Sequence, residues 1–282
     1  MASKEIRNIV VVSDLHSGCK LGLCPPGELR LDDGGFYRQS EFQKQVWKHW
    51  QYFWEQWVPD VVQGDPYAVI VNGDALDGVH HNSTTQISHN LLDQRRIAKK
   101  ILTPVVDKCE GRFYMIRGTE AHVGRSATDE EELAEDLGAI PNKVGQYSRY
   151  DLWKYVGPKV VHALHHVGTT GSAAYEATAV HKELTESFVE AGRWNRRPPD
   201  VIVRSHRHRH IEIRIAVGGK GNETSSAIAV VTPAWQGKTP FAWKVPGARL
   251  SQPQFGGIVI RYYKNELFVR HKVWSPEPDP VE

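Results

Sequence analysis

The stretch Ile9-Val10-Val11-Val12-Ser13-Asp14-Leu15-His16 decides how the rest of the chain is interpreted, because an apolar run ends there in an Asp-x-His pair. A run of β-branched residues predicts a buried strand, which we place at residues 6–13. Asp and His side chains are ligands of divalent metals. Open α/β sheets carry their ligand sites at the carboxyl ends of strands, so we expect Asp14 and His16 to border a site.

Four further polar clusters follow along the chain, and each contains Asp, Glu or His. They are Asn72-Gly73-Asp74-Ala75-Leu76-Asp77-Gly78, Arg117-Gly118-Thr119-Glu120-Ala121-His122, His165-His166-Val167-Gly168 and Ser205-His206-Arg207-His208. At least four of the five clusters come at the end of a β-rich run. A single histidine or carboxylate is usually a surface or core residue, but five such clusters in order are hard to obtain from unrelated loops. The pattern therefore predicts a metal site assembled from strand ends.

The order of these clusters resembles that of the calcineurin-like metallophosphoesterase family, which is D-x-H, G-D-x-x-D, G-N-H-D/E, a strand-end His and G-H-x-H. The resemblance covers roughly residues 8–210, in short motifs. The first two motifs match well, and Ser205 replaces the usual Gly of the last. The third motif departs most, since the family's metal-binding Asn is missing and His122 lies two positions later than the family His. This variant also resembles forms from phage and prophage genomes.

The resemblance implies an α/β fold of two packed β-sheets flanked by helices, with a dimetal site at strand ends. It implies a first metal held by Asp14, His16 and His208. It further implies that Asp74 bridges both metals and that His206 and a strand-end histidine hold the second. A water or hydroxide between two such metals, with its pKa lowered toward neutrality, would attack phosphorus.

The third motif leaves two roles open for His122. In the family, the second Asp of G-D-x-x-D orients the catalytic histidine, and Asp77 occupies that place. A carboxylate on one ring nitrogen fixes the tautomer and keeps the imidazolium available near neutral pH, which favours His122 as a general acid. The competing interpretation is that His122 replaces the missing Asn ligand, a role that Thr119 or Glu120 could fill instead.

Two further positions carry candidate site residues. His165 is the strand-end ligand if the family Gly has become His166, whereas alternation counted from Val160 favours His166. We therefore keep both histidines as candidate metal ligands. Arg207 stands inside the last motif, beside the expected metals, and is a candidate for holding a substrate phosphate because guanidinium groups pair well with phosphate oxygens.

The function that these features favour is metal-dependent hydrolysis of a phosphate ester, with a phosphodiester slightly ahead of a monoester. A mixed Asp/His set suits two divalent ions of Mn, Fe, Zn or Ni, of which we favour Mn. The arginines near His206 point to a nucleotide or nucleic acid as the substrate. The alternatives are a catalytically impaired, protein-binding scaffold of the same fold and a DNA or RNA nuclease of the same family.

Composition agrees with an enzyme domain. The chain has 282 residues, enough to bury a large core, with 40% hydrophobic and 24% charged residues. A formal net charge of +2 argues against a strongly basic nucleic-acid binder. Three cysteines make no disulfide framework, and no run approaches the roughly 18 apolar residues of a membrane helix. We expect a cytoplasmic protein with a single catalytic domain over residues 1–274 and an extended Pro-rich tail over residues 275–282.

The remaining segments predict how the chain runs between the clusters. Strands are expected at residues 67–71, 113–116, 160–164 and 201–204, and the region 211–273 is β-rich. Helices are expected at residues 36–58, 84–108, 129–137 and 172–191. In the first helix Trp47, Trp50, Trp54 and Trp57 recur at helical spacing, which predicts a buried core face, and Pro59 is expected to end it. Residues 19–35 form a Gly/Pro-rich loop long enough to overhang the site.

Overall fold

A six-stranded sheet is built around β1 (Asn8–Val12), the strand that precedes Asp14. The computed structural model describes residues 5–80, 82–168, 172–219, 223–245, 248–249 and 251–276. The strands lie in the order β13-β12-β1-β4-β5-β6. Their bounds are β4 (Tyr67–Asn72), β5 (Phe113–Ile116), β6 (Ser148–Arg149), β12 (Phe255–Tyr263) and β13 (Glu266–Trp274). β1, β4, β5 and β6 are parallel, and β12 pairs antiparallel with both β1 and β13.

The second sheet has five strands in the order β10-β11-β9-β8-β7. Their bounds are β7 (Asp151–Val156), β8 (Lys159–Leu164), β9 (Val201–Arg204), β10 (Ile211–Gly218) and β11 (Thr224–Val231). β8, β9 and β11 are parallel, and the two edge strands β7 and β10 are antiparallel to their neighbours. The four strands predicted between residues 67 and 204 are therefore confirmed, as is the β-rich region after residue 211.

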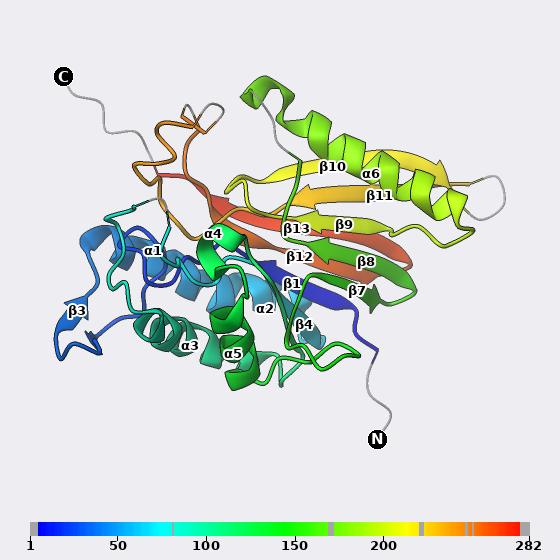
Figure 1. Ribbon diagram of the computed structural model, residues 1–282. Helices are drawn as coiled ribbons and strands as arrows, with labels where there is room; N and C mark the ends of the chain where they lie inside the picture. The colour runs from blue at the N-terminus through cyan, green and yellow to red at the C-terminus, as the bar shows by residue number, and fades with distance from the viewer. Residues whose placement is uncertain are drawn as a thin grey trace.

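Alternation along β1 decides which layer each side chain faces. Ile9 and Val11 pack between the two sheets, in the same buried cluster as Val203 of β9, whereas Val10 and Val12 face the helices. The helices α1 (Glu41–Tyr52), α3 (Leu91–Lys108) and α5 (Thr128–Asp136) cover the first sheet, and α6 (Glu176–Arg193) covers the second (Figure 1). The predicted fold of two packed sheets flanked by helices is confirmed.

The helix predicted at residues 36–58 begins later than expected. Its first residues instead form β3 (Phe36–Arg38), which pairs with β2 (Glu28–Arg30) inside the loop predicted at 19–35. Helix α1 starts after Ser40, whose hydroxyl accepts a hydrogen bond from Gln43 N while Gln43 Oε1 accepts one from Ser40 N. This capping box satisfies free N–H groups at the first turn and so places the helix start.

The prediction that Pro59 ends this helix is wrong. A π-helical turn, η1 (Phe53–Trp57), continues α1 directly into α2 (Val58–Val62), and Pro59 lies in the first turn of α2. A proline is tolerated there because a missing N–H costs least at the start of a helix, and the wider π turn interrupts the regular hydrogen-bond ladder just before it. The helical run ends instead at Gln63, which adopts a left-handed conformation.

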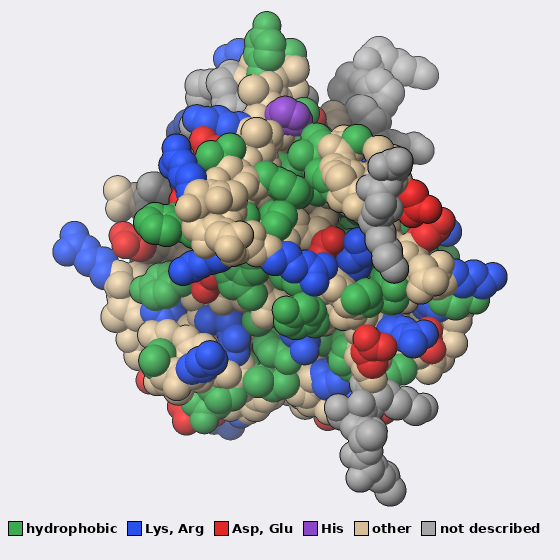
Figure 2. Space-filling model, turned by 90° about the vertical axis from the view of Figure 1, so that its right-hand side faces the viewer, with side chains coloured by type: hydrophobic (Ala, Val, Ile, Leu, Met, Phe, Trp, Pro, Cys, Tyr) green, Lys and Arg blue, Asp and Glu red, His purple; other side chains and the backbone are tan. Residues whose placement is uncertain are grey.

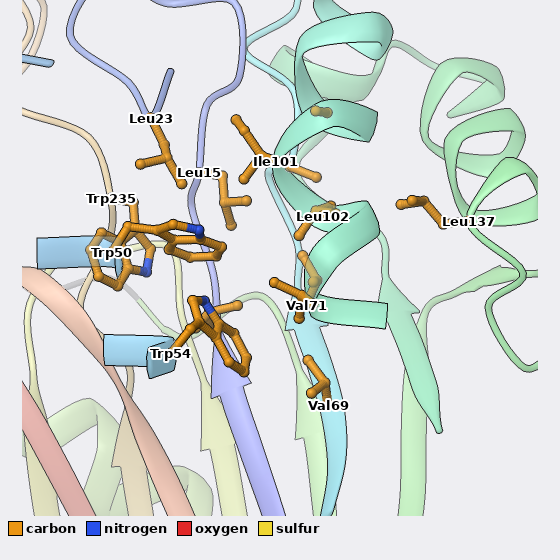
Figure 3. Close-up of a cluster of buried hydrophobic side chains, with 14 of the residues drawn as sticks. Leu15, Leu23, Trp50, Trp54, Val69, Val71, Ile101, Leu102, Leu137 and Trp235 are labelled. Atoms are coloured by element: carbon orange, nitrogen blue, oxygen red, sulfur yellow. The ribbon is translucent and has the colours of Figure 1, made fainter. Parts of the chain in front are cut away.

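The predicted core face of tryptophans is present. Trp50 and Trp54 are each 3% exposed, and Trp47 and Trp57 are partly buried against the same cluster. Figure 3 shows Trp50 and Trp54 beside Trp235, a residue from the loop after β11. The ring centroids of Trp50 and Trp235 are 4.9 Å apart and nearly perpendicular, an edge-to-face contact that stabilises aromatic pairs.

The helix predicted at residues 84–108 begins only at Leu91, as α3. The Asn90 side chain accepts a hydrogen bond from Leu92 N and caps it. Ser83 Oγ likewise accepts from Thr85 N, so short polar side chains hold residues 83–90 in turns rather than helix. These turns bond to the start of the loop after β1, because Lys20 N donates a hydrogen bond to Thr85 O.

The two remaining predicted helices are present, and one short helix is additional. The helices predicted at residues 129–137 and 172–191 are α5 and α6, and a single 3₁₀ turn at Ala173–Tyr175 precedes α6. A short helix, α4 (Glu120–Val123), was not predicted.

In the described part of the chain, no helix has both the length and the apolar character that crossing a membrane requires. Residues 277–282 of the predicted Pro-rich tail lie outside the described residues. On the face seen in Figure 2, Lys and Arg side chains are interspersed with hydrophobic and acidic ones.

Candidate metal centre

The five polar clusters all follow the carboxyl end of a strand. Three of those strands, β1, β4 and β5, are parallel neighbours in the first sheet, and the other two, β8 and β9, are parallel neighbours in the second. Because neighbouring parallel strands end at the same edge of a sheet, and the two sheets pack together, the clusters meet at one rim. The expectation that the clusters follow strand ends is confirmed.

Most of the predicted ligands lie in left-handed backbone rather than in strands. They are Asp14, His16, Asp74, His206 and His208, with φ between 45° and 70°. In an extended strand, residues i and i+2 point to one side, which would bring Asp14 beside His16 and His206 beside His208, but these four residues are not extended. The strands end first, and the side chains converge from tight loops. Left-handed residues other than glycine cost about 1–3 kcal/mol each, a strain that proteins retain mainly at functional sites.

The first group of possible ligand atoms comes from Asp14, His16 and His208, and these atoms lie within 4.8 Å of one another. His208 Nε2 lies 3.3 Å from Asp14 Oδ1 and 3.2 Å from His16 Nε2. Asp14 Oδ1 is buried and has no hydrogen-bond partner among the described residues. Burial raises the pKa of Asp14, but the nearby His208 and His165 rings outweigh it and lower the pKa to about 2. A buried carboxylate oxygen that accepts no hydrogen bond and faces imidazole nitrogens fits a divalent cation.

The second group comes from Asp74, His165 and His206, again with ligand atoms within 4.8 Å of one another. His165 Nδ1 donates to the carbonyl of Asn72 at 2.6 Å, and its Nε2 lies 3.1 Å from Asp74 Oδ2. A backbone carbonyl on the outer nitrogen is a common support for a metal-binding histidine. Burial lowers the pKa of His165, but the Asp74 carboxylate outweighs it and raises the pKa to about 10. Without a metal, His165 is therefore a cation paired with Asp74.

The structure separates the two adjacent histidines. The His165 side chain is 1% exposed and belongs to the second group, whereas His166 is exposed and belongs to no ligand group in the described ranges. The ring of His166 still lies 5.3 Å from that of His206, centroid to centroid. Alternation counted along β8 does not apply here, because the strand ends at Leu164 and the chain has left the sheet at both histidines.

His122 lies beside both groups but is held differently from the expectation. Its Nδ1 donates to the backbone carbonyl of Asp77 at 2.6 Å, and its Nε2 lies 3.9 Å from Asp74 Oδ2. Burial and the neighbouring His16 ring lower the pKa of His122 to about 4, so the ring is neutral in the metal-free protein. His122 also shares a possible ligand group with His16 and Asp74, so the alternative of a metal ligand stays open.

Among the described residues, the Asp77 carboxylate bonds to side chains other than His122, which differs from the role implied by the family resemblance. Its Oδ1 lies 3.2 Å from His16 Nδ1 and accepts a hydrogen bond from Gln236 Nε2 at 3.2 Å. Its Oδ2 accepts from Gln86 Nε2 at 2.9 Å. His122 lies on α4, two positions later than the family histidine, and its ring donates a hydrogen bond to the backbone of Asp77. A carboxylate oxygen of Asp77 still lies within 4.8 Å of a His122 ring nitrogen, in a possible ligand group that also includes His80. The Asp77 side chain instead supports a ligand of the first group.

In the third motif, Thr119 rather than Glu120 contacts the Asp74 carboxylate. Thr119 N donates to Asp74 Oδ1 at 2.7 Å, and the Thr119 hydroxyl lies 3.3 Å from the same oxygen. Glu120 is exposed. A Cβ at Gly118 would collide with the Asp74 carboxylate, so the close approach of this loop to Asp74 requires glycine at that position.

Glu130 is a site residue that the sequence does not reveal. Its side chain is fully buried, its Oε1 accepts from Ala75 N at 3.0 Å, and its Oε2 accepts from Gly118 N at 2.8 Å. It thereby ties the loops after β4 and β5 together beneath Asp74. Burial and the Asp74 charge raise the pKa of Glu130 to about 7. No signal distinguishes it, because carboxylates of an acidic helix are usually solvated.

A cavity of about 380 Å³ opens over both groups. Its wall includes His122 and Thr119 on one side, and the loop after β11 contributes the apolar residues Phe241 and Val245 on the other. Arg207 also lines the cavity, but its Nη1 and Nη2 donate to the carbonyls of Glu176 and Gly168. A guanidinium carries five N–H groups, so donors remain for a ligand.

No family model matches the chain, and no curated protein matches it. Among solved structures, Vacuolar Protein Sorting 29 from Cryptosporidium parvum is 10% identical with a TM-score of 0.33, covering 97% of this chain and 100% of that one. A Vps29 double mutant from Entamoeba histolytica is 9% identical with a TM-score of 0.36, covering 95% and 99%. Thermotoga maritima protein TM1076 is 10% identical with a TM-score of 0.37, covering 95% and 100%.

Proposed function

We propose that this protein is a metal-dependent hydrolase of phosphate esters, related in its site to the calcineurin-like metallophosphoesterases. The observation that carries the proposal is the pair of ligand groups, Asp14–His16–His208 and Asp74–His165–His206, bordering one cavity. The two groups adjoin each other, since His165 Nε2 of the second group lies 4.0 Å from Asp14 Oδ1 of the first. Two cations held so close together would need a carboxylate between them, and Asp74 is our candidate bridge.

The metal ions and the side chains around the two ligand groups would have different roles in the reaction. When bound, two divalent ions would supply Lewis-acid charge for the phosphoryl oxygens and an acidified water as nucleophile. The neutral ring of His122, whose Nδ1–H donates to Asp77, has a free Nε2 facing Asp74, which could take a proton from the attacking water and then pass it to the leaving oxygen. Arg207 lines the same cavity and is our candidate for a non-bridging phosphate oxygen.

The ligand side chains limit which metals could bind, and the cavity limits which substrates could fit. Imidazole and carboxylate ligands suit Mn, Fe, Zn or Ni, and we favour Mn. Phe241 and Val245 give the cavity an apolar wall, which would accommodate an apolar substituent on the phosphate. We therefore favour a phosphodiester over a monoester, with a nucleotide or nucleic acid as the substrate class. Because both sheets contribute ligands, we also propose that residues 1–274 form one catalytic domain. The buried, free thiols of Cys19, Cys24 and Cys109 suit a cytoplasmic setting.

The proposal is tested by measuring both the metal content and the hydrolytic activity of the same protein. Purified protein loaded with Mn²⁺ should hold two ions per chain by elemental analysis and hydrolyse an aryl phosphodiester faster than the matching monoester. Asp74→Asn should lose most of the metal and nearly all of the activity, because a neutral amide is a poor bridge between two cations. Asp136→Asn, at an exposed residue paired with Lys99, is the matched control and should change neither.

Two results would contradict the proposal in different ways. A metal-free protein that still hydrolyses the diester would remove the metal-dependent mechanism. A fully metal-loaded protein without activity on either ester would favour the protein-binding scaffold instead.

A further inference from the structure

A second cluster of possible metal ligands lies away from the cavity, at the open edge of the two sheets. β10 is an edge strand of the second sheet and β13 an edge strand of the first (yellow and red in Figure 1). His210 immediately precedes β10, Glu212 lies within it, and His271 lies in β13. One ligand atom from each of these residues lies within 4.8 Å of the other two. The cluster therefore spans the seam between the sheets.

The histidine rings of this cluster lie side by side. His210 immediately precedes β10, and Glu212 is the second residue of that strand. The rings of His210 and His271 lie 4.3 Å apart, centroid to centroid, with 39° between their planes. His210 Nδ1 lies 3.2 Å from the carbonyl oxygen of Val231, to which it donates. That hydrogen bond leaves Nε2 as the free donor atom, in the manner of a supported metal-binding histidine.

The carboxylate of Glu212 keeps an oxygen available. Its Oε1 accepts a hydrogen bond from Arg214 Nε at 2.8 Å, which engages one of the two carboxylate oxygens. His271 is exposed and Glu212 is half-buried, so a cation can enter from solvent and small rotations can tighten the group. A tetrahedral zinc site has bonds of about 2.0–2.2 Å, which implies donor separations of roughly 3.3–3.5 Å.

We propose that His210, Glu212 and His271 form a separate site for a zinc-like transition-metal dication. Two imidazoles and one carboxylate are a recurrent ligand set for Zn²⁺, with water completing the tetrahedron. A metal there would join β10 to β13 and so fasten the two sheets at their edge. It would also fasten the loop after β9, since His210 ends the same loop that carries His206 and His208. The site shares no ligand with either group at the cavity.

Counting bound zinc tests the site directly. Protein stripped with a chelator is equilibrated with Zn²⁺, freed of excess metal and measured by elemental analysis. His271→Ala should hold one ion per chain fewer than the wild type. His181→Ala removes an exposed histidine on α6 that belongs to no ligand group in the described residues, and should leave the count unchanged. A His271→Ala protein with the wild-type count overturns the proposal.

A second measurement separates this site from the dimetal proposal and does not depend on counting alone. In an Asp74→Asn background, which weakens the cavity site, one zinc should still bind. At a hundredfold excess over Kd it should raise the melting temperature by roughly 5 °C. Adding His271→Ala to that background should abolish both the ion and the shift. If the wild type holds a single ion that His271→Ala removes, the edge site stands and the dimetal proposal fails. If Asp74→Asn binds no zinc, the edge site is refuted.

Discussion

The carboxylate of Asp77 lies 3.2 Å from Nδ1 of His16, and each side chain is only 1% exposed. The side-chain amides of Gln86 and Gln236 also donate hydrogen bonds to the carboxylate of Asp77. A carboxylate behind a histidine fixes the tautomer and strengthens the opposite nitrogen as a ligand. Asp77 therefore acts on the first ligand group, whereas the ring of His122 is held by the Asp77 backbone.

Asp77→Asn should weaken the first metal rather than the proton transfer. Loss of a carboxylate behind a ligand typically costs about 10–100-fold in metal affinity. We expect that loss in a chelator competition assay, with kcat largely restored at saturating metal. Asp136→Asn serves as the surface control. An unchanged affinity with a lowered kcat would instead return Asp77 to the role of orienting His122.

His122→Ala distinguishes a proton donor from a ligand. As a donor, the variant should keep both metals while kcat falls by roughly 10²–10⁴, the usual size of a general acid–base contribution. Elemental analysis of this one variant decides the matter. A drop to about one ion per chain would place His122 in the coordination sphere and refute its catalytic role.

His165 and His166 form a natural matched pair. His165 is buried against Asp74, whereas His166 is exposed outside both groups, so His165→Ala should lose the second metal and His166→Ala should keep it. Activity should follow the metal, falling by several orders of magnitude only in the first variant. Equal metal loss in both variants would show that the exposed ring also coordinates.

Metal binding should release a proton from His165. Its pKa of about 10 in the metal-free protein means that the ring is protonated at neutral pH, whereas a ligand nitrogen must be free of its proton. Apparent affinity should therefore rise with pH up to about 10. Titration calorimetry in buffers of different ionisation enthalpy measures the released proton. His165→Ala should release about one proton fewer, and an undiminished release from that variant would assign the proton elsewhere.

Glu130→Gln should loosen the loops that carry Asp74. An amide offers one acceptor oxygen where the carboxylate offers two, so the N–H of either Ala75 or Gly118 loses its partner. A buried unpaired N–H costs about 1–3 kcal/mol, measurable by denaturant unfolding, and the second metal should weaken alongside. Glu135→Gln, at an exposed position of the same helix, should do neither. Unchanged stability and metal affinity in Glu130→Gln would remove Glu130 from the site.

Much of the fold and most of the candidate metal centre follow from short-range features of the sequence. Apolar runs such as residues 9–12 predict strands because burial of β-branched side chains is a local property, and polar residues directly after them mark the strand ends. The capped starts of α1 and α3 were misplaced, since Ser40 and Asn90 compete with helix through single side-chain hydrogen bonds that a broad apolar pattern does not register.

Only the tertiary structure decides which side chains from distant loops come into contact. His165 rather than His166 reaches Asp74 because the chain has left β8 before either residue, so strand alternation no longer predicts direction. Glu130 belongs to the site because α5 lies beneath the loops after β4 and β5. The edge cluster of His210 and His271 exists because two different sheets bring their edge strands together. Sequence patterns describe the periodicity of one segment, whereas a site of this kind depends on the relative placement of several.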